Sequence, residues 1–159
     1  MAQSSAGESD LTAVAYRWLA RRDRSRAEMR GYLERYCSDP DAVERLLDDL
    51  AARGWLSEDR LADQVIRSRR ARGSAQRIRQ EMSRRGISAD VITQSTLGLD
   101  DGDLATAARL LRKRFRLPAA DQAERERQLR FLLNRGFSRA IALKAVRASA
   151  EDDASESRD

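Results

Sequence analysis

The chain has 159 residues, of which 36% are charged and 41% hydrophobic, and its formal net charge is +5. It contains no histidine and a single cysteine, so histidine-based catalysis, zinc clusters and internal disulfides are all excluded. Neither of the common glycine-rich phosphate-binding patterns occurs. We therefore expect a non-enzymatic protein without cofactor or metal, in which an anionic partner balances the positive charge.

Clustered carboxylates are the one remaining candidate for catalysis or metal binding. They occur at Asp48–Asp49, at Asp100–Asp101–Asp103 and at Asp152–Asp153. These positions lie beside expected helix ends or in the C-terminal tail, where solvated charge is common. We interpret them as solvated charge and assign no catalytic residue.

In chain order, apolar residues recur at the three- and four-residue spacing of amphipathic helices, and no long segment alternates as a strand would. The helical stripes cover residues 11–19, 29–36, 43–50, 61–68, 75–82, 91–97, 104–115, 129–133 and 141–146. No stretch is long and apolar enough to span a membrane, and residues 1–10 do not resemble a signal peptide. The pattern predicts an all-α protein, which we expect in the cytoplasm.

Helix starts are marked by capping residues. Ser25 and Glu28 form a capping box, in which each side chain accepts a backbone N–H of the other residue. Asp39 followed by Pro40 suits an N-cap with proline at the first helical position. Further N-cap candidates are Ser57, Ser74, Ser88 and Ser138.

Helix ends are marked by glycines that each follow an arginine, and they are Gly54, Gly73, Gly86 and Gly136. Glycine accepts the left-handed conformation of a helix C-cap, and we expect that conformation at all four positions. After three of them comes an apolar residue suited to packing against the cap, namely Trp55, Ile87 or Phe137.

The helix starts and ends are part of an internal sequence repeat. The sequence Arg-Gly-apolar-Ser at residues 85–88 recurs fifty residues later at 135–138, and a divergent copy stands at 35–38. We predict three tandem three-helix repeats, stacked into an elongated, curved helical array, because three short helices alone bury too little apolar surface. The predicted repeats cover residues 11–56, 57–99 and 101–150, flanked by a flexible N-terminus (1–10) and an acidic, disordered tail (151–159).

Positive charge is concentrated in a few segments. Residues 67–85 carry eight arginines against one glutamate, a net charge of +7, and residues 109–116 carry five cations and no acid. Residues 17–35 have a net charge of +4. These segments are either solvated helix faces in an arginine-rich chain or surfaces for phosphates and acidic side chains. Because few aromatic residues interleave with the arginines, base stacking is not indicated there.

The central segment resembles the signature of RecX regulatory proteins. The likeness rests on residues 55–62 (WLSEDRLA), 67–73 (RSRRARG), 77–82 (RIRQEM) and 85–87 (RGI), flanked by 26–30 (RAEMR) and 131–138 (FLLNRGFS). It extends over about residues 11–148. Two departures are mild: Leu61 stands where the family usually has Phe, and Ser74-Ala75 stands where many members have a Gly-Pro-like stretch.

The resemblance implies three tandem three-helix repeats and a protein that lodges in the RecA–DNA filament, inhibiting the recombinase, ATPase and coprotease activities of RecA. It thereby implies a role in homologous recombination, DNA repair and the SOS response. The expected partners are RecA and single- or double-stranded DNA without sequence specificity, and a monomer without membrane contact is expected. We expect filament or DNA contacts from Arg67, Arg70, Arg72, Arg77, Arg84, Arg109, Arg112 and Arg116.

Two other interpretations remain open at this point. A free-standing DNA-binding module of helix-turn-helix type would discriminate strongly between DNA sequences. A helical adaptor without a nucleic-acid role would show no DNA affinity even at low salt. Arg79 and Arg85 suit either a binding or a structural role, whereas Ile78 and Met82 are expected in the core.

Overall fold

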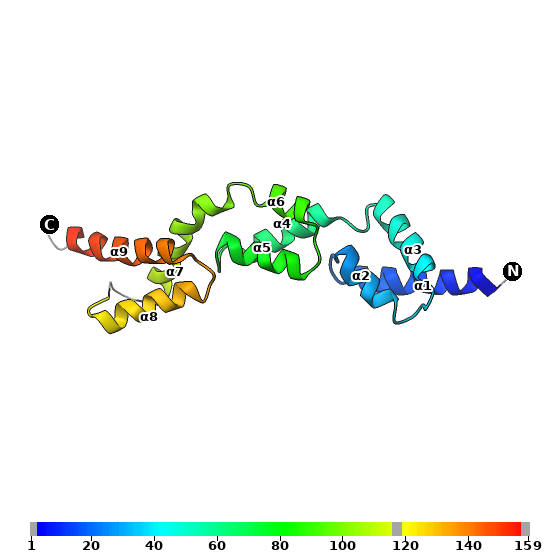
Figure 1. Ribbon diagram of the computed structural model, residues 1–159, viewed down its shortest axis with the longest axis horizontal. Coiled ribbons are helices and arrows are strands. Elements are labelled where there is room, and N and C mark those ends of the chain that lie inside the picture. The colour runs from blue at the N-terminus through cyan, green and yellow to red at the C-terminus, as the bar shows by residue number, and fades with distance from the viewer. Residues whose placement is uncertain (1–2, 116–118, 157–159) are drawn as a thin grey trace. The chain divides into compact units, whose positions relative to one another are not determined.

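The structure is a computed structural model that describes residues 3–115 and 119–156, with side chains described for residues 10–115 and 119–149. Within these ranges the chain is helical and has no strand, which confirms the all-α prediction (Figure 1). The helices are α1 (Gln3–Leu19), α2 (Arg26–Leu33), α3 (Pro40–Ala52), α4 (Glu58–Arg69), α5 (Ala75–Arg84), α6 (Ala89–Ser95), α7 (Asp103–Arg114), α8 (Gln122–Leu133) and α9 (Arg139–Glu156), with a 3-10 turn at Leu99–Gly102.

Both terminal helices are longer than the apolar spacing indicated. Helix α1 begins at Gln3 and α9 continues to Glu156, so helix extends into the segments expected to be flexible and disordered. Neither extension contains a proline, so the backbone can continue a helix that is already packed further along. None of the helices in the described part of the chain has the length and apolar character needed to cross a membrane.

The chain divides into two compact units whose boundary passes through α4 and α5. Unit 1 comprises residues 1–64 and 82–95, and unit 2 comprises residues 65–81 and 96–159. Each unit therefore combines one end of the chain with part of the central helices. Among those central helices Ile78 and Met82 are fully buried, as expected from their spacing.

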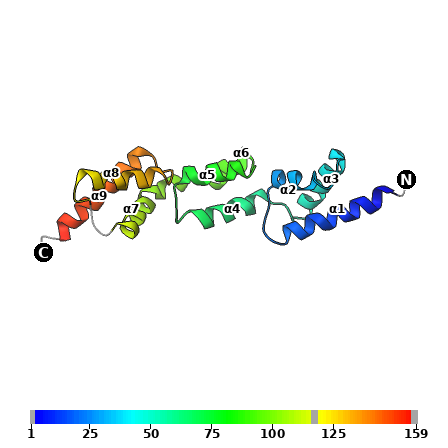
Figure 2. The ribbon, with the colours of Figure 1, turned by 90° about the horizontal axis from the view of Figure 1, so that it is seen from below.

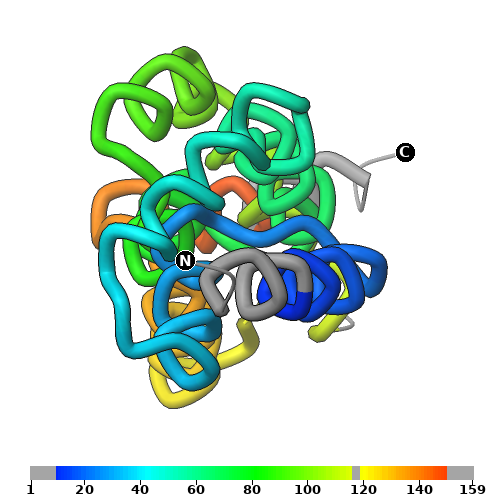
Figure 3. The backbone as a smooth tube through the Cα atoms, turned by 90° about the vertical axis from the view of Figure 1, so that its right-hand side faces the viewer, coloured from blue at the N-terminus to red at the C-terminus, as the bar shows by residue number. Residues whose placement is uncertain are grey.

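The core of unit 1 is aliphatic and is built by α1, α2 and α3. Figure 3 looks along α1, with the following helices beside it. The buried residues are Leu11, Ala15, Leu19, Met29, Leu33, Val43, Leu47, Leu50 and Leu56. Because α2 has only eight residues, its stability depends on this packing rather than on its own hydrogen bonds.

The core of unit 2 is built by α7, α8 and α9, where α9 packs against both other helices (Figure 2). Its buried residues are Ala107, Leu111, Leu132, Phe137, Ala142 and Ala145. Three of these six residues are alanines, which allow close approach of the helices.

Most of the predicted caps are present. Ser25 and Glu28 form the complete capping box, and Asp39 accepts a hydrogen bond from the Asp41 N–H with Pro40 at the first helical position. Ser57, Ser74 and Ser138 each accept a backbone N–H three residues later, at 3.2 Å. The carbonyl of Ser88, the residue before α6, accepts the Ile92 N–H.

The glycine predictions hold at three of four positions. Gly54, Gly86 and Gly136 have positive φ values of 76°, 74° and 84°. The backbone N–H of the residue after each glycine donates to a carbonyl oxygen in the last turn of the preceding helix and closes the turn. The expectation for Gly73 was wrong, because its φ is not positive. Gly73 is buried, and a Cβ there would lie 3.2 Å from the Arg135 carbonyl oxygen, so close backbone approach explains the glycine.

A serine N-cap contacts a glycine turn once in each unit, and we call these two contacts the first and the second joint. In the first joint, within unit 1, the Ser25 hydroxyl donates to the Arg85 carbonyl oxygen next to Gly86. In the second joint, within unit 2, the Ser74 hydroxyl donates to the Gly136 carbonyl oxygen at 2.6 Å. In both joints a serine N-cap of one repeat binds the glycine turn of the next repeat. The two bonded residues are 60 positions apart in the first joint and 62 in the second.

Candidate anion-binding surface

The eight arginines of residues 67–85 fall into two groups, those that form ion pairs and those that do not. Four of them bind carboxylates, in the pairs Arg69–Glu81 (2.8 Å), Arg70–Asp103 (2.7 Å), Arg79–Asp100 (2.7 Å) and Arg85–Glu28 (3.1 Å). The other four, Arg67, Arg72, Arg77 and Arg84, are exposed. About half of the positive charge in this segment is therefore compensated inside the protein.

Arg70 has a structural role in unit 2. Its side chain is 25% exposed and bound to Asp103, whose side chain is 8% exposed. The same carboxylate accepts the buried Ala75 N–H at 3.0 Å, at the first residue of α5. Gly102 leaves the room that the Arg70 guanidinium occupies, because a Cβ there would collide with it. Arg70 and Asp103 thus hold the start of α5 to the start of α7.

Asp103 and Asp100 correct the interpretation of their cluster as solvated charge. Asp103 is buried, and Asp100 accepts two hydrogen bonds from the Arg79 guanidinium, at 2.7 and 2.9 Å. This bidentate pair holds the pKa of Asp100 below its ordinary value, and the same hydrogen bonding raises the pKa of Arg79. The sequence signal for these pairs was weak, because nothing local distinguishes their aspartates from exposed ones.

Glu28 joins the capping box to Arg85 in the first joint. Burial by itself raises the pKa of this carboxyl group. The hydrogen bonds from Arg85 and from the Ser25 backbone N–H, with the charges of Arg85 and Arg22, outweigh burial, so the pKa lies below its ordinary value. Arg85, with a side chain 15% exposed, is therefore a structural residue rather than a surface cation.

The exposed arginines of this segment have few partners. The side chains of Arg67 on α4, Arg72 in the turn before α5, and Arg84 on α5 make no hydrogen bond or ion pair with any residue that the structure describes. Arg77 donates to the Asn134 carbonyl oxygen at 3.0 Å, which leaves its charge without a carboxylate partner. Arg77 and Arg84 lie seven residues apart on α5, or two helical turns.

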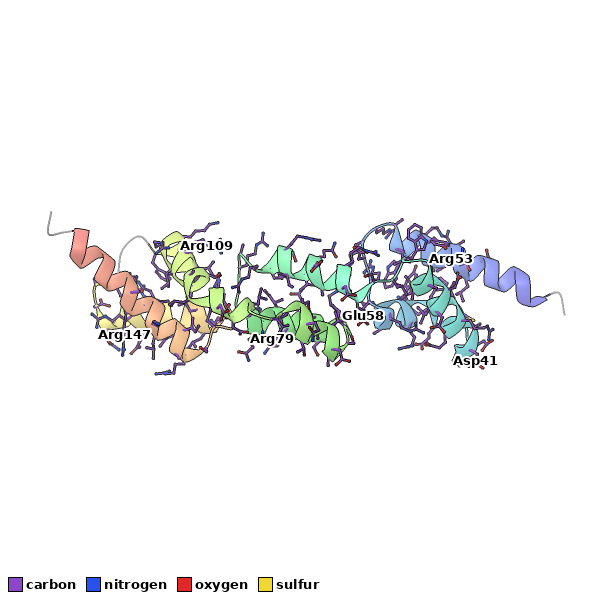
Figure 4. The ribbon with its side chains drawn as sticks, turned by 90° about the horizontal axis from the view of Figure 1, so that it is seen from above. Asp41, Arg53, Glu58, Arg79, Arg109 and Arg147 are labelled. Atoms are coloured by element: carbon purple, nitrogen blue, oxygen red, sulfur yellow. The ribbon has the colours of Figure 1, made fainter. Side chains whose placement is uncertain are left out.

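The second basic run lies on α7 in unit 2. Arg109 and Arg112 are exposed and make no ion pair with a described residue, and Figure 4 shows Arg109 extending from α7, with Arg79 on α5. The Arg114 guanidinium lies 5.7 Å from the Phe115 ring centroid. Arg116, also expected to bind, lies outside the described residues.

Chemically, these side chains suit anion binding. Exposed guanidinium groups bind phosphate or carboxylate oxygens through paired N–H donors. Like charges three residues apart on a helix repel each other and destabilise it slightly. An anion bound between Arg109 and Arg112 would reduce this repulsion.

Comparison with protein families covers most of the chain. Residues 13–50, 57–95 and 101–146 match the first, second and third three-helix domains of RecX, respectively. The protein named "Regulatory protein RecX" from Leptothrix cholodnii is 42% identical over 137 residues, which are 86% of this chain and 87% of the relative. Its namesake from Chromobacterium violaceum is 40% identical over 144 residues, or 90% and 93% of the two chains.

A solved structure has the same fold. The crystal structure of RecX from Lactobacillus salivarius aligns with a TM-score of 0.78 at 17% sequence identity, over 91% of this chain and 97% of that one. At this low identity the alignment concerns the fold alone. It agrees with three three-helix domains in tandem.

Proposed function

Because the chain belongs to the RecX family of regulatory proteins, we propose that it binds the RecA–DNA filament and inhibits the recombinase, ATPase and coprotease activities of RecA. It acts in the cytoplasm as a monomer, as part of homologous recombination, DNA repair and the SOS response. The contact is made by exposed arginines that have no carboxylate partner among the described residues. These are Arg67, Arg72, Arg77, Arg84, Arg109 and Arg112.

The observation that carries this proposal is the division of the arginines into two groups. A chain that used arginine only for internal ion pairs would supply an acid for each, as it does for Arg69, Arg79 and Arg85. The remaining cations face solvent without one. Arg70 is left out of the binding set because its guanidinium already holds Asp103.

The proposed contact is not sequence-specific, since guanidinium groups on phosphates carry no base information. If all six arginines met single-strand phosphates, log affinity would fall against log salt with a slope of about −4, at roughly 0.7 per contact. A slope near zero would assign the contact to acidic side chains of RecA instead of DNA.

The decisive measurement is RecA ATPase on single-stranded DNA with the protein added well below one-to-one. We expect strong inhibition by the unaltered chain and at least a tenfold weaker effect from the R67E/R72E variant. The matched control is R125E/R127E, which makes the same change in charge at two exposed arginines of α8. Equal inhibition by the two variants would show that these arginines do not form the binding surface.

The helix-turn-helix alternative is tested by competition. A sequence-specific reader would bind a selected duplex several orders of magnitude more tightly than random DNA. We expect instead that duplexes of different sequence compete equally at a given salt concentration.

A further inference from the structure

Unit 1 contains an aromatic cluster that the sequence did not reveal. The rings of Trp18 on α1 and Tyr32 on α2 stack with centroids 4.1 Å apart and planes 14° from parallel. Tyr36, just after α2, packs on Tyr32 at 5.2 Å, and its hydroxyl group donates to the Tyr32 hydroxyl at 3.3 Å. The cluster joins residues up to eighteen positions apart.

Guanidinium groups surround these rings. Arg24 lies 4.0 Å from the Trp18 ring centroid, and Arg35 lies 5.9 Å from that of Tyr32. A ring and a guanidinium group at about 4 Å cannot share one face of an indole, so Tyr32 and Arg24 occupy its two faces. Both faces of the Trp18 ring are therefore covered, and the ring of the cluster that remains open to a ligand is Tyr36, which is 56% exposed.

Beside the cluster is a pocket of about 270 Å³, which we call the tyrosine pocket. Its lining residues are aliphatic, aromatic or cationic, and none is acidic: Val14, Arg17, Trp18, Arg21, Tyr32 and Tyr36. Arg17, in the last turn of α1, and Arg21, two residues after α1, are exposed and make no ion pair with any described residue. The volume suits one planar ring and is below the range of pockets for larger ligands, roughly 300–1,000 Å³.

We propose that the tyrosine pocket binds an unpaired base of single-stranded nucleic acid, which stacks on Tyr36 while Arg17 and Arg21 bind the adjoining phosphates. Sites for single strands elsewhere combine these two elements, an aromatic platform and a cationic track along the backbone. An acidic peptide would use the arginines but leave the Tyr36 ring without a partner. A duplex would present phosphates but no exposed base face. The site shares no residue with the arginine surface proposed above.

The test uses the whole 159-residue chain and fluorescence anisotropy at low salt with a labelled oligothymidylate of about twenty nucleotides. An abasic oligomer of the same length and charge measures the phosphate contribution alone. We expect tighter binding of oligothymidylate than of the abasic strand. Y36A should weaken oligothymidylate binding about fivefold to a hundredfold, and Y36F should bind as the unaltered chain does. Oligouridylate binding as tight as that of oligothymidylate would support the same site and show that it accepts both sugars.

Equal binding of the abasic strand would overturn the proposal, and so would an unchanged affinity for oligothymidylate in Y36A. Displacement by polyglutamate at equal charge would also overturn it, in favour of a protein ligand. The R17Q/R21Q variant should make the salt slope shallower by about 1.4, from two contacts at roughly 0.7 each. Far-UV circular dichroism monitors folding, and because Tyr36 lies outside the core of unit 1, we expect no change.

If R67E/R72E keeps the affinity for oligothymidylate but loses inhibition of RecA, the two sites are separate. If Y36A loses oligothymidylate binding while inhibition of RecA persists, the tyrosine pocket is supported independently of the proposed filament contact.

Discussion

Both joints place a serine N-cap against a glycine turn, although the hydroxyl donates to the carbonyl oxygen of Arg85, before the glycine, in the first joint and to that of Gly136 itself in the second. They also differ three residues after the serine. In the first joint that residue is Glu28, which binds Arg85 of the turn. In the second joint it is Arg77, which donates to the Asn134 carbonyl oxygen of the turn. The turn arginine of the second joint, Arg135, lies 3.7 Å from the Phe131 ring centroid instead.

This difference decides where positive charge is left over. The first joint neutralises its turn arginine internally, with a carboxylate from the capping box. The second joint places a cation at the equivalent position and satisfies it with a carbonyl oxygen, which accepts a hydrogen bond but carries no formal charge. One kind of backbone contact thus serves as a closed structural joint in unit 1 and leaves an exposed cation in unit 2. The predictions below test that contrast.

The largest effect is expected from R70E. Reversing this charge removes the partner of the nearly buried Asp103, places a like charge beside it and disturbs the start of α5, which carries the second joint. We expect a loss of about 4 kcal/mol in the free energy of unfolding, measured with urea. R67E makes the same change three residues earlier, at an exposed side chain, and should cost less than about 0.5 kcal/mol. Equal stability of the two variants would remove the structural role of Arg70.

The next effect concerns the glycine of the first joint. Alanine at Gly86 would have a left-handed backbone and a Cβ 2.5 Å from that of Ala27, so we expect G86A to destabilise the protein by about 3 kcal/mol. Gly54 has the same left-handed conformation, but a Cβ at this position would have no neighbouring atom within 4 Å. G54A should therefore cost only about 1 kcal/mol, from backbone strain. A similar loss in both variants would mean that Ala27 moves aside without cost.

These cases show which parts of the fold were predictable. The Ser25–Glu28 capping box and the turns at Gly54, Gly86 and Gly136 follow from rules that act over a few residues, and the structure confirms them. Gly73 carried the same local signal and was assigned wrongly. Its role depends on the Arg135 carbonyl oxygen, more than sixty residues away.

The candidate site was less predictable for the same reason. The charge pattern located the basic segment, but the sequence could not show that Arg70 binds Asp103 while the Arg67 side chain forms no ion pair with a described residue. Arginines are chemically identical, so only the folded chain selects their partners. The stacking of Trp18 on Tyr32 was hidden too, because the two rings come from different helices.

A smaller effect is expected from E28Q in the first joint. Glutamine keeps the shape of the capping box but removes the charge that holds Arg85, and we expect a loss of about 1–2 kcal/mol at pH 7. E34Q is the matched control, at an exposed glutamate just after α2 that makes no ion pair with a described residue, and it should be nearly neutral. Thermal or urea unfolding distinguishes the two variants.

The same substitution has a defined pH dependence. The folded-state pKa of Glu28 is depressed, so its stabilisation is complete above the unfolded value of about 4.3. It is lost as the pH falls through that value and then through the lower folded pKa. The difference in stability between the unaltered chain and E28Q should therefore shrink as the pH is lowered from about 6 to 3. A constant difference over this range would mean that the carboxylate charge contributes nothing to the joint.

The smallest effect on stability is expected from R77Q, at the equivalent position of the second joint. Arg77 is exposed and bound only to a carbonyl oxygen, so replacing it should cost less than about 0.5 kcal/mol in urea unfolding. Its effect should appear instead in RecA inhibition, because an exposed cation is lost, and in a salt slope shallower by about 0.7 if that cation meets a single-strand phosphate. A larger loss of stability in R77Q than in E28Q would invert the contrast, because the charge in the second joint would then be the structural one.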